Sequence, residues 1–468
     1  MATGTPPRQD HAVIAELARG FGGEVVGPDH PGYDRHRAVW NGAVDRRPAV
    51  VARCADVADV AAVVAMARET GLELAVRGGG HSFPGLSVVD DGVVLDLSLM
   101  RKVDVDPVGR IARVQGGALL GELDRATQAH GLAVPTGAVT HTGVAGLTLG
   151  GGIGWLMRRH GLTVDNLRSA EVVTADGRVL RASPSTNPEL FWGLRGGGGN
   201  FGVVTEFEFD LHPVGPDVLS GFVLWHMDDA EEVAAFYRGW AREAPRELTT
   251  ALVLRRAPAI DLVPAALHGA HVVGVLGCWA GPLDEGEAYW QPLRAFGRPV
   301  ADLTTRRPFL AHQAMLDAGF PHGQHVHMKA CDVADLDDDV VARSIEHARR
   351  MASPRSSFIA WQLGGAVADV DADATAFASR EAGFIVNITG IATDAEGLDR
   401  ERRWVRDFWS ALSPHETSVY VNFLHDAPAD RVRSAYGPER FPRLQALKRA
   451  YDPENLFRLN QNIPPQPP

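Results

Sequence analysis

Lysine and cysteine are scarce in this 468-residue chain. Its lysines are Lys102, Lys329 and Lys448, and none of them follows a glycine. A Walker-type phosphate-binding loop, which needs a Gly-Lys pair, is therefore excluded. The three cysteines are widely separated in the sequence. Their number and spacing exclude a disulfide framework and a Cys-x-x-Cys metal site, and they fit a reducing compartment.

Long apolar runs and an excess of basic charge are also missing. No stretch approaches the length of a membrane span, and the ten N-terminal residues are polar, so we expect no membrane insertion and no signal peptide. The 46 basic and 58 acidic residues give a formal net charge of -12, which argues against a nucleic-acid-binding protein. We therefore expect a cytoplasmic protein. Its length exceeds what one hydrophobic core holds, which predicts at least two domains.

Glycine is abundant and is concentrated in three segments. The first follows a predicted β-α-β unit, made of a strand over Pro48–Arg53, a helix over Asp56–Thr70 and a strand over Leu72–Val76. The glycine turn Arg77–Ser82 comes directly after it and contains His81. Glycines allow backbone N–H groups to approach a ligand closely, and the imidazole adds a nucleophile beside that ligand.

The second segment, Thr136–Trp155, has seven glycines in twenty residues, too many for an ordinary helix or strand. It is interpreted as backbone pressed against a large flat ligand, with a tightly packed corner as the alternative. The third segment, Arg195–Gly202, matches Gly-x-Gly-x-x-Gly. It follows a predicted helix and precedes a predicted strand over Val203–Leu211, the reverse of a dinucleotide-binding fingerprint, so a nicotinamide site is rejected.

Beyond Pro213 the glycine clusters thin out, and predicted helices and strands alternate. This pattern indicates an α+β domain in which an antiparallel sheet is covered on one face. The predicted helices are Asp229–Glu243, Leu283–Phe296 and Asp337–Ala352, and the predicted strands are Ala251–Arg255, Val272–Cys278, Phe358–Leu363 and Phe384–Ile391. Near the C-terminus we expect a strand over Thr417–Phe423 and a helix over Phe441–Tyr451.

Three histidines, His322, His325 and His327, lie close together in the sequence. No carboxylate or cysteine completes a metal-ligand set at the usual spacing, so we expect no metal site. They are interpreted as part of a loop that faces a substrate. No Gly-x-Ser-x-Gly or His-Glu-x-x-His motif is present, which leaves a hydrolase without support.

Four motifs together resemble one family. They are the Arg77–Ser82 loop, the Thr142–Gly154 run, the strand entry Gly199–Thr205 and the ending Tyr451–Ile463. In this order and spacing they resemble the berberine-bridge-enzyme-like FAD-linked oxidases of the vanillyl-alcohol-oxidase superfamily. The resemblance covers nearly the whole chain.

This resemblance implies an α+β, two-domain p-cresol-methylhydroxylase-type FAD-binding fold. Residues 1–210 and 417–468 would form the FAD domain, and residues 211–416 a substrate domain whose antiparallel sheet, backed by helices, roofs the flavin. The implied cofactor-binding residues are Arg77, Gly78, Gly79, Gly80, His81, Ser82, Gly137, Thr140, Thr142, Gly143, Gly146, Gly152, Gly154, Val204, Asn460 and Asn462.

In this family the histidine of the first glycine loop bonds covalently to the 8α carbon of the flavin, and that role falls to His81. The alternative is that His81 only hydrogen-bonds the cofactor. Doubly linked members carry a cysteine just before the Thr-Gly-Val run, where this chain has Val139. The resemblance therefore implies FAD attached through His81 only.

The family transfers a hydride from a small organic substrate to flavin N5, and molecular oxygen usually reoxidises the flavin to give hydrogen peroxide. Here the substrate could be an alcohol, sugar, amine or secondary metabolite. Tyr420 is the leading candidate for the base or for a residue that orients substrate, and a strand residue in the core is its alternative. Gln362, Arg380 and Asn422 are further candidates for substrate contacts.

Two departures from the family pattern keep other functions open. Phe423 stands where members of the family have a second tyrosine, and Thr393 ends a strand where plant members have a carboxylate. The alternatives are a dehydrogenase of the same fold with an acceptor other than oxygen, and a catalytically degenerate flavin-binding protein.

Overall fold

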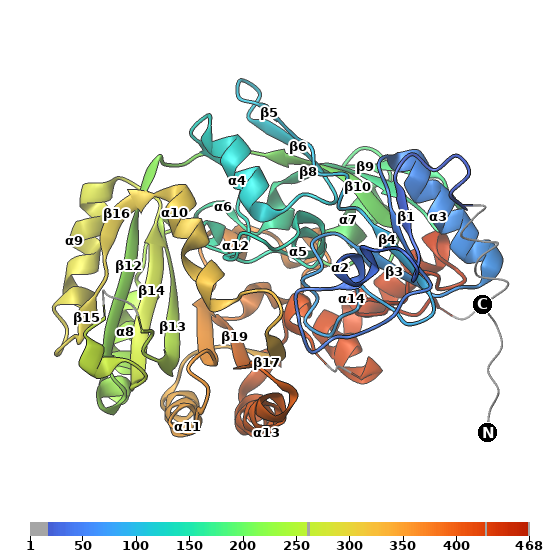
Figure 1. Ribbon diagram of the computed structural model, residues 1–468. Helices are drawn as coiled ribbons and strands as arrows, with labels where there is room; N and C mark the ends of the chain where they lie inside the picture. Colours follow the sequence, from blue (N-terminus) through green and yellow to red (C-terminus); the bar gives the residue numbers. More distant parts are fainter. Residues whose placement is uncertain (1–16, 260–262, 426–427, 467–468) are drawn as a thin grey trace.

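The computed structural model describes residues 17–259, 263–425 and 428–466. Three β-sheets dominate the molecule, with the largest on one side and two smaller ones on the other (Figure 1). A two-stranded pairing of β7 (Leu132–Ala133) with β11 (His212–Pro213) lies apart from them. Within the described residues, no helix is both long and apolar enough to cross a membrane.

The first small sheet has the strand order β1-β2-β4-β3. Its strands are β1 (Glu24–Val26), β2 (Val50–Arg53), β3 (Leu74–Arg77) and β4 (Val93–Asp96), and both β2 and β3 run parallel to β4. Helix α3 (Val57–Thr70) joins β2 to β3, which confirms the predicted β-α-β unit. The helix begins where the carboxylate of Asp56 accepts the Asp59 N–H at 3.0 Å and ends at Gly71, whose φ is 71°.

The second small sheet is antiparallel, with the order β5-β6-β10-β8-β9. Its strands are β5 (Val103–Asp106), β6 (Ile111–Gln115), β8 (Leu167–Val173), β9 (Val179–Ala182) and β10 (Val203–Asp210). The helices on this side of the molecule are α2 (Tyr33–Arg37), α4 (Leu120–Gln128), α5 (Val144–Leu149), α6 (Met157–His160), α7 (Pro188–Leu194) and α14 (Ala429–Tyr451).

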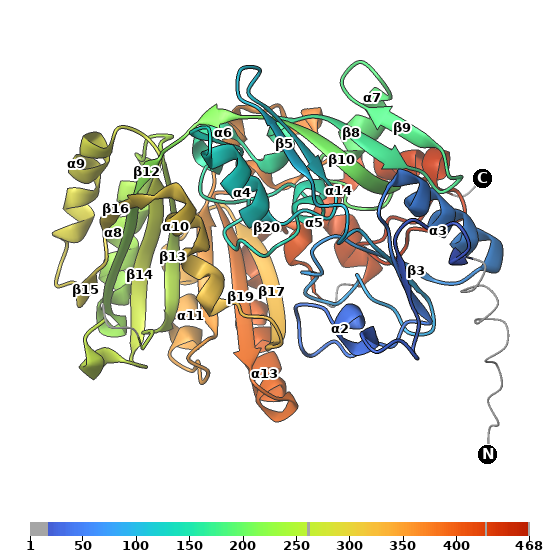
Figure 2. The same ribbon diagram turned by 45° about the horizontal axis from the view of Figure 1, so that its top comes forward.

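The C-terminal segment shares a hydrophobic core with the N-terminal part of the chain. Leu444 of α14 and Ile463 are buried in the same cluster as Leu190 and Phe207. Figures 1 and 2 accordingly show α14, in red, beside the green strands β8 and β10. The half of the molecule that carries the two small sheets is thus built from two ends of the chain that are more than 200 residues apart.

The large sheet is antiparallel and has the order β15-β12-β14-β13-β18-β19-β17-β20, with β16 also paired to β12. Its strands are β12 (Asp217–His226), β13 (Leu248–Arg256), β14 (His271–Trp279), β15 (Ala301–Asp302), β16 (Thr305–Pro308), β17 (His325–Val333), β18 (Ser357–Gln362), β19 (Phe384–Ala392) and β20 (Glu416–Ser418). The helices of this region are α8 (Ala230–Arg242), α9 (Leu283–Arg294), α10 (Phe309–Gln313), α11 (Asp338–Ala348), α12 (Ala366–Asp369) and α13 (Ala395–Leu412).

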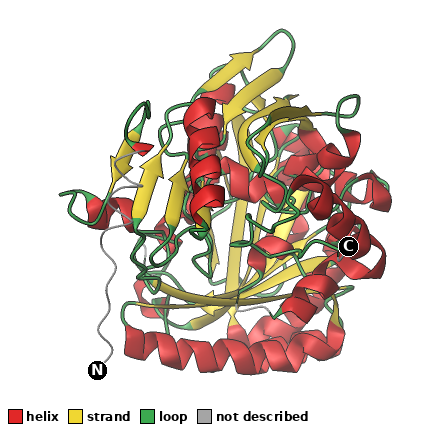
Figure 3. Ribbon diagram, turned by 90° about the vertical axis from the view of Figure 1, so that its right-hand side faces the viewer, coloured by secondary structure: helices red, strands yellow, loops and turns green. Residues whose placement is uncertain are grey.

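The two faces of the large sheet have different partners. One face packs on α8, α9, α11 and α13, whose side chains share a core with Phe358 and Ala360 of β18. Helices α8, α11 and α13 lie at the bottom of Figure 1 and belong to the helix layer seen below the strands in Figure 3. The opposite face contributes Ile359 and Trp361 to a cluster with Trp155 of the second glycine segment. The fold is therefore α+β. The face of the large sheet opposite these helices, called the free face below, is turned toward the glycine segments.

Several predicted elements need correction. The expected strand over Thr417–Phe423 is shorter, because Glu416–Ser418 pairs with β17 and Val421–Phe423 forms a 3-10 turn. Strand β17 was missed, and it carries His325 and His327, which were assigned to a loop. The proposed boundary between residues 416 and 417 also falls inside β20. The domain limits themselves stay a prediction.

Candidate active site

A cavity of about 350 Å³ lies between the glycine segments and the free face of the large sheet. Three kinds of segment line it. The glycine segments contribute Gly78–Ser82, Gly137–Val139, Thr142, Gly143, Gly146 and Gly198–Val204 in part; the C-terminal segment contributes Phe457 and Leu459–Gln461; the sheet side contributes Met328, Ile359, Trp361, Asn387, Thr389 and Tyr420–Leu424.

The floor of the cavity depends on contact between two glycines. A Cβ at Gly79 would lie 2.3 Å from the Gly143 nitrogen, and a Cβ at Gly143 would lie 2.3 Å from the Gly79 nitrogen. The two loops therefore meet backbone to backbone, and only glycine fits at either position. Gly80 has a φ of 68°, which L side chains rarely adopt. Together these glycines form a surface of bare backbone.

Arg77, predicted to bind the cofactor, instead supports this loop from beneath. Its guanidinium donates to the Asp96 carboxylate at 2.7 Å, and both side chains are buried. Arg77 ends β3 and Asp96 ends the parallel strand β4, so the pair ties the two strand ends together. Arg77 is not among the residues that line the cavity.

The second glycine segment divides into a cavity part and a packing part. Gly137, Thr142, Gly143 and Gly146 line the cavity. In contrast, a Cβ at Gly152 would lie 2.1 Å from Thr163 Oγ1, and one at Gly154 would lie 1.8 Å from the Thr136 carbonyl oxygen. Both interpretations of this run therefore describe part of it, and Gly152 and Gly154 belong to the packed corner.

Thr140 also turns away from the cavity. Its N–H donates to Asp317 Oδ1 at 2.8 Å and its hydroxyl donates to Asp317 Oδ2 at 2.5 Å. Asp317 lies in a 3-10 helix, Ala314–Gly319, that precedes β17. Thr140 thus anchors the second glycine segment to the 3-10 helix before β17.

At the C-terminal side, Asn460 lines the cavity while Asn462 does not. The Asn460 Nδ2 group donates to the Gly199 carbonyl at 3.1 Å and to the Phe457 carbonyl at 2.9 Å. Its Oδ1 atom is buried and has no hydrogen-bond partner among the described residues. A buried oxygen of this kind requires a donor, and a bound ring system with N–H groups would supply one.

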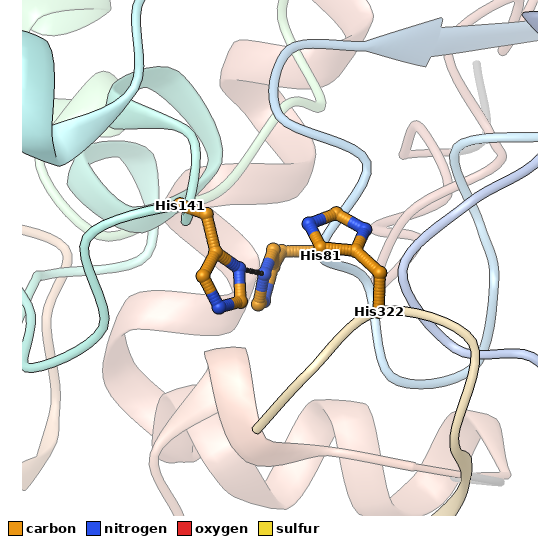
Figure 4. A group of neighbouring side chains, drawn as sticks. All are labelled: His81, His141 and His322. Atoms are coloured by element: carbon orange, nitrogen blue, oxygen red, sulfur yellow. Dashed lines mark hydrogen bonds between the residues drawn. The ribbon is translucent and has the colours of Figure 1, made fainter. Parts of the chain in front are cut away.

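His81 lies in the cavity wall between two aromatic neighbours. Its ring stacks on Trp40 with centroids 4.6 Å apart, and its Nε2 atom lies 2.7 Å from Nδ1 of His141 (Figure 4). The Trp40 indole N–H donates to the Phe320 carbonyl, which fixes the stacking surface. Burial, and then the neighbouring imidazoles His141 and His322, hold the pKa of His81 well below its usual value, so the ring is neutral.

The roof of the cavity comes from alternate residues of β18 and β19. Trp361 Nε1 donates to Asn387 Oδ1 at 3.2 Å, and Asn387 Nδ2 donates to Thr389 Oγ1 at 3.1 Å. Ile359 of β18 and Met328 of β17 add apolar surface to the roof. Among the described residues that line the cavity, none is Asp, Glu, Lys or Arg.

Tyr420 reaches the cavity from the loop after β20. Its hydroxyl oxygen accepts the Gly152 N–H at 2.9 Å and the Asn422 Nδ2–H at 2.8 Å. Burial raises the pKa of Tyr420 to about 12, against the effect of these two hydrogen bonds. The phenol is therefore protonated at neutral pH, and its oxygen is oriented by two donors. Asn422 also lines the cavity.

Two predicted substrate residues are placed elsewhere, and these predictions are corrected. Gln362 is adjacent to Trp361 on β18 and so points to the opposite face, where it donates to the Ala241 carbonyl and accepts from Thr250 at 2.8 Å. Arg380 forms a buried ion pair with Asp165 at 2.6 Å. Neither residue lines the cavity.

Sequence reasoning missed four of the residues that define this site: Trp40, His141, Trp361 and Asn387. For Trp361 the signal was available, since strand alternation places either it or Gln362 on the cavity face, and the wrong one was chosen. His141 lies inside the second glycine segment, and nothing in its local sequence marks it as a neighbour of His81. Trp40 carried no local signal, because its contact with His81 joins residues 41 positions apart.

Taken together, the bare glycine floor, the unpaired Asn460 oxygen and the neutral histidine in the wall fit a large planar cofactor with polar ring edges. A helix-backed antiparallel sheet above such a floor is the arrangement that the resemblance implies for a flavin-dependent oxidoreductase. The Gly79–Gly143 contact and the free Asn460 Oδ1 atom are the features that fit FAD.

Comparison with known proteins gives the family. Residues 48–183 match the family model for an FAD binding domain, and residues 419–464 match the model for berberine and berberine like proteins. The chain is 33% identical over 464 residues to (R)-6-hydroxynicotine oxidase of Paenarthrobacter nicotinovorans, covering 95% of this chain and 97% of that protein. It belongs to the berberine-bridge-enzyme-like FAD-linked oxidoreductases.

A second relative and a solved structure agree. An uncharacterised FAD-linked oxidoreductase of Bacillus subtilis is 32% identical over 456 residues, covering 95% of this chain and 97% of that protein. The crystal structure of 6-hydroxy-D-nicotine oxidase from Arthrobacter nicotinovorans superposes with a TM-score of 0.86 at 31% identity, covering 96% of this chain and 99% of that one. The protein is thus an FAD-dependent enzyme that oxidises a small organic molecule.

Proposed function

We propose that this enzyme is an oxidase that holds FAD covalently through His81 alone and removes a hydride from an uncharged, largely apolar amine. The observation that carries the proposal is the cavity itself, in which a neutral histidine lies in the wall and the described lining residues carry no formal charge. Bound FAD would supply the hydride acceptor, and molecular oxygen would reoxidise it to give hydrogen peroxide.

Single attachment is supported by the position of the thiols. Val139 lines the cavity at the place where doubly linked relatives carry cysteine. The three cysteines, Cys54, Cys278 and Cys331, are buried and unpaired, and none of them lines the cavity. Three free thiols also support the proposed cytoplasmic location.

The cofactor would be held by backbone more than by side chains. We propose that the loops around Gly79 and Gly143 hold it through N–H groups, that Val204 packs against it and that Asn460 Oδ1 accepts from it. Ser82 and Thr142 line the same cavity and offer hydroxyl groups. Five further residues predicted to bind the cofactor do not line the cavity and would shape the site from behind its wall: Arg77, Thr140, Gly152, Gly154 and Asn462.

The amine is favoured because its oxidation needs no base. Hydride removal from a carbon beside a neutral nitrogen leaves the positive charge on that nitrogen, whereas an alcohol must also lose its O–H proton. The described lining offers no carboxylate, and Tyr420, with a pKa of about 12, is protonated at neutral pH. Tyr420 would therefore orient the substrate by donating its hydroxyl proton to a heteroatom.

An alcohol is the second candidate substrate. The two hydrogen bonds from Gly152 and Asn422 to the Tyr420 oxygen would stabilise its phenolate form and so favour it as a base. The relative named for 6-hydroxynicotine supports the amine. In either case Trp361 and Asn387 would contact the substrate from the roof.

Acid precipitation of the purified protein tests the cofactor part of this proposal. We expect a yellow pellet whose flavin fluorescence stays with the chain on a denaturing gel. His81→Ala should release all flavin, and Val139→Ala should leave attachment unchanged. A colourless wild-type pellet with free FAD in the supernatant would overturn the covalent link.

Oxygen consumption with a panel of amines, alcohols and sugars tests the reaction. Hydrogen peroxide formed with a neutral amine supports the oxidase. If a substrate reduces the flavin under anaerobic conditions but air does not reoxidise it, the enzyme is a dehydrogenase. If the panel reduces no flavin, the catalytically degenerate alternative replaces this proposal.

A further inference from the structure

Three histidines from separate segments meet beside the cavity. His81 follows β3, His141 lies in the second glycine segment, and His322 lies in the loop that leads to β17. One nitrogen from each lies within 4.8 Å of the others (Figure 4). Such a group could bind a metal ion, or two of its members could share a proton.

The closest distance in the group favours proton sharing. Two nitrogens bound to one tetrahedral zinc, each about 2.0–2.1 Å from the ion, lie roughly 3.3 Å apart. His81 Nε2 and His141 Nδ1 are separated by only 2.7 Å, a hydrogen-bond length. One of these two nitrogens therefore carries a proton and the other accepts it.

Covalent attachment of a flavin to His81 requires a particular one of these two tautomers. His81 lines the cavity, whereas His141 and His322 do not. A neutral imidazole has one lone pair available for bonding and one N–H. If His81 Nε2 donates to His141 Nδ1, the lone pair of His81 Nδ1 is free to form a bond. With the opposite tautomer, the His81 Nδ1 atom would carry the proton and could not act as a nucleophile.

We infer that His141 is the base that takes the Nε2 proton of His81 while His81 Nδ1 bonds to the 8α carbon of FAD. This inference rests on the proposed covalent link through His81. The bond that forms is N–C, and the bond that breaks is a C–H of the 8α methyl group. The electron pair of that C–H bond stays on the flavin and is passed to molecular oxygen, which with the two released protons becomes hydrogen peroxide.

The surroundings of His141 suit this role. Burial and the neighbouring His322 lower the pKa of His141, so the ring is neutral and able to accept a proton at neutral pH. The Asp317 carboxylate, held by Thr140, acts in the opposite direction and favours the imidazolium that forms. Stacking on Trp40 restrains the orientation of the His81 ring.

His141 variants test the inference through attachment itself, without substrate turnover. The full-length chain is produced in a riboflavin-starved host and mixed with FAD in air, and covalent flavin is measured over time in acid-precipitated protein. His141→Ala should slow attachment by about 10²-fold, the usual contribution of general base catalysis. Added imidazole should restore part of the rate, because a small base can enter the space left by the side chain.

His141→Asn and His322→Ala are the matched comparisons. The amide oxygen of asparagine accepts a hydrogen bond but takes no proton, so His141→Asn should bind FAD and attach it as slowly as His141→Ala. His322→Ala removes a neighbouring imidazole that forms no hydrogen bond with His81 in the described part of the chain. This variant should attach FAD at a rate within about twofold of wild type. The wild-type rate should fall as pH drops through the pKa of His141, where His81, His322 and Asp317 are the other titratable groups nearby.

Each outcome has a distinct meaning. If wild type holds only dissociable FAD, the covalent part of the proposed function fails and this inference fails with it. If wild type attaches FAD and both His141 variants attach it at the same rate, only the base role is overturned. Stoichiometric zinc that is retained by wild type and lost in both His141→Ala and His322→Ala would also overturn it, in favour of a metal site.

Discussion

Replacing Gly79 by alanine is expected to force apart the two glycine loops that carry His81 and His141. The new Cβ would lie 2.3 Å from the Gly143 nitrogen and 2.5 Å from the Gly143 Cα. Both atoms belong to backbone and cannot rotate away. Ordinary contact begins at 3.4 Å, so the loops must separate by about 1.1 Å. Overpacking of this size costs about 1–3 kcal/mol of folding free energy.

The effect on attachment should exceed the effect on stability. A displacement of ~1 Å lengthens the 2.7 Å contact between His81 and His141 and shifts the histidine relative to the flavin, which can lower a rate by about 10²-fold. Thermal unfolding followed by circular dichroism measures the first effect. The covalent fraction in acid-precipitated protein measures the second.

Two other glycine variants serve as controls. Gly239 lies within α8, and a Cβ there would meet no atom within 4 Å, so Gly239→Ala should stabilise the fold by up to about 1 kcal/mol without changing attachment. Gly146→Ala also meets no protein atom, but the position lines the cavity. It should fold normally and bind FAD more weakly. If Gly79→Ala has the same unfolding temperature and the same covalent flavin fraction as wild type, the close contact between the two loops is wrong.

Three further variants test the site and its surroundings. Tyr420→Phe should retain turnover of neutral amines within about tenfold, because only an orienting hydrogen bond is lost, and should lose alcohol oxidation, which needs a base; equal losses with both substrates would contradict a base role in alcohol oxidation. Arg380→Met leaves the buried Asp165 carboxylate without its ion-pair partner and should lower the free energy of unfolding by about 3–5 kcal/mol, without raising the KM of the folded enzyme. Arg402→Met breaks the exposed ion pair with Asp399 and should change stability by less than about 1 kcal/mol. Burial raises the pKa of Asp124 to about 7 in the folded protein, whereas the unfolded carboxyl ionises near its usual value of about 4. The free energy of unfolding should therefore fall as pH rises from about 4 to 7, and Asp124→Asn should flatten that dependence in urea titrations.

Local sequence was a good guide where one physical cause dominates. The helix α3 has a side-chain cap at Asp56 and a left-handed glycine at its end, and it was predicted to within one residue. The glycine loops were found because no regular element tolerates so many glycines. The Thr417–Phe423 strand was predicted too long, because only Thr417 and Ser418 lie in β20, whereas Tyr420 and Val421 are buried against other segments outside the sheet.

Side-chain roles were harder to predict than elements. Gln362 and Arg380 are polar residues, and sequence alone does not reveal that Gln362 hydrogen-bonds Ala241 and Thr250 and that Arg380 pairs with Asp165. A one-residue choice on β18 decides between Trp361 and Gln362, and only the packing of α8 against the opposite face resolves it. Period-two alternation fixes the two sets of residues and leaves open which set faces the cavity.

By itself, the sequence determined that this chain binds FAD in the manner of its family, because four glycine and asparagine motifs in order are needed to build one cofactor floor. The tertiary structure decided what surrounds that floor. It placed uncharged residues of β18 and β19 over the cavity and brought His141 within hydrogen-bond distance of His81. These contacts join residues tens to hundreds of positions apart, and their chemistry depends on burial and distance, which no local pattern encodes.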